Sequence, residues 1–135
     1  MVEFALMLPF VVMLLLGGLN VALATHARLV ASHGAAQAGL YAALMPAADE
    51  LDAGNAAGEY GPAAVQSILD AGADCIVWRV AAAGVDVDST SVTISRPEAD
   101  QWRITVRTTF APIGPVSLGS FDVAASTVAR RLPAT

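Results

Sequence analysis

One long apolar segment near the start of the chain limits the possible folds more than any other feature. Between Phe4 and Ala24, Asn20 is the only strongly polar side chain. A helix from Phe4 to Ala24 is about 31 Å long, which matches the roughly 30 Å hydrocarbon core of a lipid bilayer. A buried helix of a soluble domain is the simpler alternative, but continuous apolar runs of this length are rare there. The segment therefore predicts a membrane-spanning helix.

A secretory signal peptide is a second alternative, because the Ala-Leu-Ala sequence that ends at Ala24 is an acceptable cleavage site. Two features oppose it. No Lys or Arg precedes the apolar run, and the helical pattern continues without a break to Met45, where Pro46 ends it. We therefore expect one helix over about residues 3–45. Its length of about 65 Å is twice what spanning requires, so half of it projects from the membrane.

The projecting half carries a small side chain at every fourth position. Stripes of this kind let helix backbones approach closely, because no bulky side chain keeps them apart. We therefore predict that this face is used for helix packing. The residues of the stripe are Ala27, Ala31, Ala35, Gly39 and Ala43.

The stretch 46–61 is rich in acidic residues, Gly and Ala without a clear period, and we interpret it as a solvated acidic linker. A head domain then follows over residues 62–135. Its first part has apolar residues on one face of a helix that begins at Pro62 and ends before Gly84. Gly72 weakens this prediction, and "CIVWRV" is alternatively a short strand.

The apolar period changes to two after Ser91, which predicts β-structure. "SVTIS" and "WRITVRTTF" flank the turn-rich "RPEADQ", as in an antiparallel hairpin with one buried face. "FDVAASTVARRL" is a candidate third strand, with Phe121, Val123 and Ala125 facing inward. The predicted fold class is α+β, with a long N-terminal membrane-spanning helix and a small head in which one amphipathic helix packs on a short antiparallel sheet. The buried face of the second strand is formed by Trp102, Ile104, Val106, Thr108 and Phe110.

Charge and composition argue against several classes of function. The formal net charge is −5 and all seven cations are scattered arginines, whereas nucleic-acid binding needs a concentrated basic face. His26 and His33 lack a third ligand at metal spacing. Cys75 is the only cysteine and has no His partner in its sequence context, so we interpret it as a small buried apolar residue. We expect no catalytic, cofactor-binding or metal site.

Glu3 is unusual because it places an acid at the head of a membrane helix, where such residues are usually functional. One interpretation is that it lies among the lipid headgroups and stabilises the helix N-terminus. A second comes from the surrounding residues. The opening "VEFALMLPF", the long helix continuing into "AAQAGLYAA", and the late "VTI", "WRITVRTTFAPIGP" and "VARRL" resemble the TadE-like minor pilins or pseudopilins of tight-adherence (Tad, type IVc) pilus systems, within the type IV pilin superfamily.

The resemblance implies a pilin-like subunit that is held in the cytoplasmic membrane by one span, with its head outside the cytoplasm. It implies processing by a prepilin peptidase, which removes a short basic leader ending in Gly. It also implies that Glu3 pairs with the N-terminal amine of a neighbouring subunit during assembly. Glu3 lies two residues nearer the start than the family spacing, as expected for a processed or truncated form or a misplaced gene start.

The functional hypothesis is a minor pilin or pseudopilin that assembles with other pilins and the pilus assembly machinery, for adhesion or secretion. A major structural pilin is a close alternative. A single-pass membrane-anchored binding domain that never assembles is an alternative from another class. An enzyme is a third alternative, but it requires a convergent polar pocket that these residues do not indicate.

Overall fold

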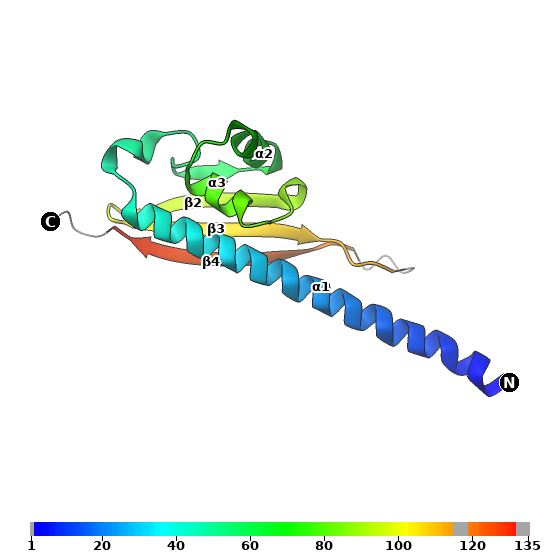
Figure 1. The fold of residues 1–135 in the computed structure, drawn as a ribbon. Coiled ribbons are helices and arrows are strands. Elements are labelled where there is room, and N and C mark those ends of the chain that lie inside the picture. Colours follow the sequence, from blue (N-terminus) through cyan, green and yellow to red (C-terminus); the bar gives the residue numbers. More distant parts are fainter. Residues whose placement is uncertain (1, 115–118, 132–135) are drawn as a thin grey trace.

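The computed structural model describes residues 2–114 and 119–131 and consists of one very long helix and a compact α/β head (Figure 1). Two short 3-10 helices, η1 and η2, lie among the connections. In chain order the elements are α1 (Val2–Leu44), η1 (Ala47–Leu51), β1 (Gly58–Tyr60), α2 (Pro62–Ala71), α3 (Ile76–Ala82), η2 (Val87–Ser89), β2 (Thr90–Glu98), β3 (Gln101–Phe110) and β4 (Phe121–Arg130). This arrangement confirms the predicted α+β, pilin-like fold.

The four strands form one antiparallel sheet in the order β1-β2-β3-β4. The predicted hairpin is confirmed, because Ile94 pairs with Ile104 and Val92 pairs with Val106. The alternation along β3 is also confirmed: even-numbered residues from Trp102 to Thr108 are buried, and Arg103 and Arg107 are exposed. The period of two therefore identified which face of the sheet lies on the core.

The third strand of the prediction is β4, which pairs with β3 along its whole length. Val123 and Ala125 face inward as expected, but the side chain of Phe121 is 46% exposed. Phe121 begins β4 at the end of the sheet that lies beyond the core, where its ring packs against that of Phe110 at a centroid distance of 5.1 Å. The alternation gives the side of the sheet correctly, but it does not reveal where the covering layer ends.

Helices cover one face of the sheet (Figure 1). The C-terminal half of α1 lies along β3 and β4 and contacts α3 beside it, and α2 packs on α3 and β2. The core between these layers is apolar, with small residues from α1 and larger ones from α3 and the strands. Its largest fully buried side chains include Trp102, Ile76, Ile94, Ile104, Val65, Val77, Val80, Val92 and Val106.

The single helix expected from Pro62 to Ala83 is wrong, because the chain forms two helices there. Gly72 ends α2 in the left-handed conformation at φ 65°, which a residue with a side chain rarely adopts. A new helix, α3, then begins after Cys75, whose sulfur accepts a hydrogen bond from the Trp78 N–H at 3.4 Å. "CIVWRV" is therefore the start of a helix and not a strand.

The stretch expected to be a solvated linker contains regular structure, namely η1 and the edge strand β1. Asn55 explains how this polar segment is held. Its buried amide accepts a hydrogen bond from the Ile76 N–H at 2.9 Å and donates one to the Asp49 carbonyl at 2.9 Å. One side chain thus connects the segment to the N-terminus of α3, a contact that has no periodic signal in the sequence.

An acid in η1 is held by two arginines at the end of the sheet farthest from the start of α1. Glu50 forms an ion pair with Arg96 at 2.8 Å and a second with Arg131. The Arg96 guanidinium also lies 4.5 Å from the ring centroid of the buried Trp102. These contacts connect η1 to the C-terminal end of β2 and to the residue that follows β4.

The buried and exposed faces of β3 give a direct test of the sheet assignment. Ile104→Asp places an unpaired charge at a position with no exposed surface and is expected to reduce the free energy of unfolding by more than about 4 kcal/mol, enough to unfold the head. Arg103→Asp, on the solvent face, is expected to change it by less than about 0.5 kcal/mol. Circular dichroism during chemical denaturation measures both, and equal tolerance of the two changes contradicts the assignment.

Candidate functional site

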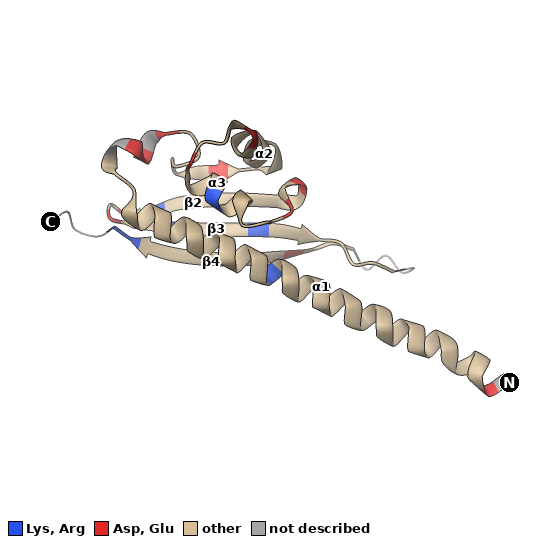
Figure 2. Ribbon diagram, viewed as in Figure 1, with Lys and Arg blue, Asp and Glu red and all other residues tan. Residues whose placement is uncertain are grey.

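The N-terminal half of α1 is an exposed apolar rod with one acid at its start. Glu3 lies in the first turn with an exposed side chain, and the ion pairs found among residues 2–114 and 119–131 do not include it. No Asp, Glu, Lys or Arg follows until Arg28, and the ribbon of this half is uncharged in Figure 2. The large apolar side chains from Phe4 to Leu15 are all exposed, although such side chains are normally buried in water-soluble proteins.

This exposed half has the length and composition of a membrane span. The candidate span lies within Glu3–Leu44, and the most apolar part of that helix has none of its residues buried by the rest of the protein. A core helix of a soluble protein would instead be covered. The geometry fits a protein that is anchored in a membrane by the N-terminal half of α1.

The C-terminal half of α1 is packed against the head by its small residues. Ala31, Ala35 and Gly39 of the predicted stripe are buried, whereas Ala27 and Ala43 are only partly buried. The reason is helical geometry. Residues four positions apart are rotated by about 40° around the helix axis, so the first and last of the five stripe residues differ by about 160°. The ends of the stripe therefore leave the face that its centre presents to the head.

Three further small residues complete the buried face, and the four-residue period missed them. Ala38 and Ala42 have no exposed surface, and Gly34 is also buried. Spacings of three and four residues taken together, as in any amphipathic helix, identify them. The small size of these three residues is the sequence feature that indicates a close approach between α1 and the head.

Two glycines mark the points of closest approach between α1 and the head. A methyl group added at Gly39 would lie 2.9 Å from Cγ2 of Thr127 on β4. A methyl group at Gly34 would lie 3.2 Å from the carbonyl oxygen of Val80 on α3. The backbone of α1 thus rests almost directly on both neighbours, and a larger side chain at Gly39 has nowhere to go.

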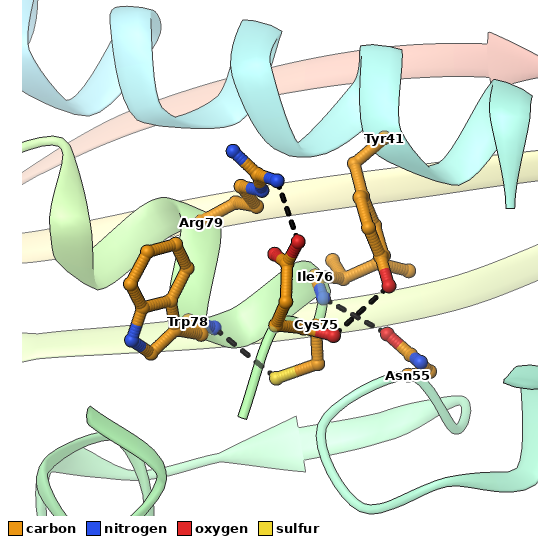
Figure 3. A network of polar contacts seen from close by, with 7 residues as sticks. Tyr41, Asn55, Cys75, Ile76, Trp78 and Arg79 are labelled. Atoms are coloured by element: carbon orange, nitrogen blue, oxygen red, sulfur yellow. Dashed lines mark hydrogen bonds and ion pairs between the residues drawn. The ribbon is translucent and has the colours of Figure 1, made fainter. Parts of the chain in front are cut away.

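Polar contacts fasten the same face of α1 to the start of α3 (Figure 3). The Tyr41 hydroxyl donates a hydrogen bond to the Asp74 carbonyl at 2.9 Å, and the Arg79 guanidinium forms an ion pair with the Asp74 carboxylate at 2.6 Å. Arg79 also lies 5.4 Å from the Tyr41 ring centroid. Because the ion pair is partly exposed, its contribution to stability is small, and the network serves mainly to orient α3.

The cysteine and the two histidines, which are the residues with possible reactive chemistry, lie in surroundings that indicate no catalytic role. Burial raises the pKa of the Cys75 thiol, which keeps it protonated and unreactive as a nucleophile. His33 is exposed and contacts Gln37 at 2.8 Å, and His26 is exposed nearer the membrane half. The described residues contain no group of three or more His, Cys, Asp or Glu side chains placed to hold a metal ion.

Comparison with known protein families gives a match to the helix just described. Residues 1–40 match the model of the TadE-like protein family. No curated protein and no solved structure matches the chain. The TadE-like match confirms the resemblance predicted from the opening residues and is consistent with a pilin of a Tad pilus system. It covers the apolar half of α1 and most of the packed half.

The close contact at Gly39, within the TadE-like segment, predicts a strong asymmetry between two glycines of one helix. Gly39→Leu is expected to reduce the free energy of unfolding of the head by about 2–3 kcal/mol, because the overpacking exceeds the gain in helix propensity. Gly17→Leu is the matched control, since no atom lies within 4 Å of a methyl group added there. Thermal unfolding of the detergent-solubilised protein measures both, and equal melting temperatures contradict the close packing.

Proposed function

We propose that this protein is a minor pilin or pseudopilin of a Tad pilus system. It is anchored in the cytoplasmic membrane by the N-terminal half of α1, with its head on the extracytoplasmic side, and it assembles with other pilins through that helix. One observation carries the proposal. A single continuous helix is uncharged from Phe4 to Ala27 and exposed along most of that length, and it then forms part of the core of a folded head. A subunit that moves from a lipid environment into a bundle of helices needs this combination.

The outward face of α1 beside the head supports assembly over a simple anchor. Leu29, Leu40 and Leu44 are each more than 60% exposed, and they lie on one side of the helix because eleven residues make about three turns. Leu40 and Leu44 border a surface hollow together with Tyr41 and Arg79. Exposed apolar side chains in a row outside the membrane indicate a contact with another protein.

The small-residue stripe does not distinguish the proposed pilin from a lone membrane anchor. Ala31, Ala35 and Gly39 pack against the protein's own head, which accounts for their size without a second subunit. Ala27 and Ala43, which are partly exposed, remain candidates for packing between subunits. The evidence for assembly therefore lies in the outward leucines and in Glu3.

Glu3 is proposed to pair with the N-terminal amine of a neighbouring subunit after a prepilin peptidase has removed a leader. Either charge alone in lipid costs several kcal/mol, and pairing relieves both costs. The acid then favours docking of subunits at one depth and in one register. The competing account is that Glu3 stabilises the N-terminus of its own helix among the headgroups.

Charge removal at Glu3 separates these two accounts. Glu3→Gln keeps shape and hydrogen bonding but deletes the charge, so membrane insertion should persist while co-purification with pilin partners falls on the order of tenfold or more. Glu59→Gln removes the same charge from the exposed strand β1 and is expected to have no effect. Cross-linking after membrane extraction provides the measurement. If Glu3→Gln assembles as well as the unaltered protein, the capping account replaces charge pairing.

The outward leucines give an independent test of assembly. Leu40→Glu should leave the free energy of unfolding within about 0.5 kcal/mol, because the side chain is exposed, and should reduce cross-linking to pilin partners several-fold. Ser67→Glu adds the same charge to an exposed position of α2 and serves as the control. Unchanged cross-linking of Leu40→Glu would favour the single-pass binding domain.

A further inference from the structure

The most polar side chain of the apolar segment makes a long-range contact with the loop that leaves β3. The Asn20 amide nitrogen donates a hydrogen bond to the Ile113 carbonyl at 2.8 Å, and the Ile113 N–H donates one to the Asn20 amide oxygen at 2.7 Å. Both polar groups of one backbone residue are therefore satisfied by one side chain. The contact joins α1 to the end of the sheet that faces the membrane half.

The position of Asn20 along the helix places this contact at the edge of the bilayer. With Glu3 at one boundary, Asn20 lies about 26 Å along the helix, inside a hydrocarbon core roughly 30 Å thick. A backbone N–H and a backbone C=O at the boundary between the hydrocarbon core and the interfacial layer have little water to bond, so leaving either group unpaired is unfavourable. The reciprocal pair removes that cost for the Ile113 backbone and for the Asn20 side chain together.

The sequence near this contact is free of charged residues both on α1 and in the segment that connects β3 to β4. The sequence from Phe110 to Phe121 contains no charged residue, and Asp122 follows it. On α1 the first charge after Glu3 is Arg28, and Arg28 and Asp122 border one surface hollow together with Phe121. In Figure 2 the described part of the chain that follows β3 carries no charged residue, and it runs toward the uncharged half of α1. The first charged residues beyond the apolar zone, Arg28 on α1 and Asp122 on β4, therefore lie at the same level along the helix axis.

Three apolar side chains gather at this end of the sheet, and we call them the tip patch: Phe110, Ile113 and Phe121. Ile113 is 56% exposed and Phe121 is 46% exposed, and the rings of Phe110 and Phe121 pack at a tilt of 55° with their centroids 5.1 Å apart. Aromatic and aliphatic side chains that are bordered by charged residues on one side are typical of a segment that lies in the interfacial layer of a membrane.

We propose that the tip patch is a second membrane contact, which rests in the interfacial layer of the lipid bilayer and is held at that depth by the Asn20–Ile113 pair. This inference rests on the membrane anchoring in the proposed function. The lipid surface is the occupant because the patch lies beside the span, at the level where the uncharged zone ends. The head would then be fixed to the membrane at two points, the N-terminal half of α1 and the tip patch.

Depth measurements in vesicles test the proposal with the full-length chain. Single cysteines at Ile113, Leu15 and Ala99 carry an environment-sensitive fluorophore, in a Cys75→Ser background that keeps a hydrogen-bond acceptor for α3. The vesicles contain equal amounts of phosphatidylethanolamine and phosphatidylglycerol with a nitroxide-labelled lipid as quencher. The expected result is strong quenching at residues 15 and 113, several-fold above that at residue 99 in the distant β2–β3 turn.

The alternative results identify which idea fails. Quenching at residue 15 but not at residue 113 overturns the tip contact and leaves the anchor intact. An absence of quenching at residue 15 overturns the anchor itself. Disulfide cross-linking between two unlabelled Ile113→Cys copies, together with no lipid quenching of the labelled protein, would instead assign the tip patch to a second copy of the chain and overturn the lipid contact.

A variant of Asn20 tests whether the amide pair holds the tip. Asn20→Leu makes the helix more apolar but leaves both backbone groups of Ile113 unpaired, so quenching at residue 113 should fall several-fold while that at residue 15 persists. Thr25→Ala is the matched control, because the Thr25 hydroxyl donates its hydrogen bond to the Val21 carbonyl of its own helix. Unchanged quenching at residue 113 in Asn20→Leu would contradict the role of the pair.

Discussion

The near contact between the backbone of α1 and the head is the constraint on which the rest of the structure depends. Gly39 and Gly34 let the helix lie directly on β4 and α3, and the buried alanines between them keep the surfaces continuous. Larger side chains from the opposite layer, above all Trp102 and Ile104, fill the space beneath. Because the small side chains of α1 are used inward, its leucines face outward and define the surface that another molecule can meet.

One helix therefore serves in two environments. Its C-terminal half gains stability from burial against protein, whereas its N-terminal half has no protein cover and is suited to lipid. Asn20 lies where these two halves meet, and its amide forms two hydrogen bonds with the backbone of Ile113 in the loop after β3. The TadE-like match over residues 1–40 extends across this junction.

Strong periodic signals made the long helix and the hairpin predictable from the sequence. The apolar run from Phe4 to Ala24 and the alternation from Trp102 to Phe110 each repeat one rule over many residues. The break at Gly72 was missed because a single residue with positive φ competes with a helical period that continues on both sides. Asn55 and Asn20 could not be assigned, because each acts through contacts with residues distant in sequence, which leave no local pattern.

The continuity of α1 also has a mechanical consequence. The helix passes from the uncovered half into the head without a hinge, and its axis runs along the length of β3 and β4 (Figure 1). A force that pulls the N-terminal half along its axis would load the interface between helix and sheet in shear. In that direction every close contact from Ala31 to Ala42 must slide at the same time, whereas a perpendicular force would peel the contacts apart one after another. The head is thus built to carry axial tension as a single unit.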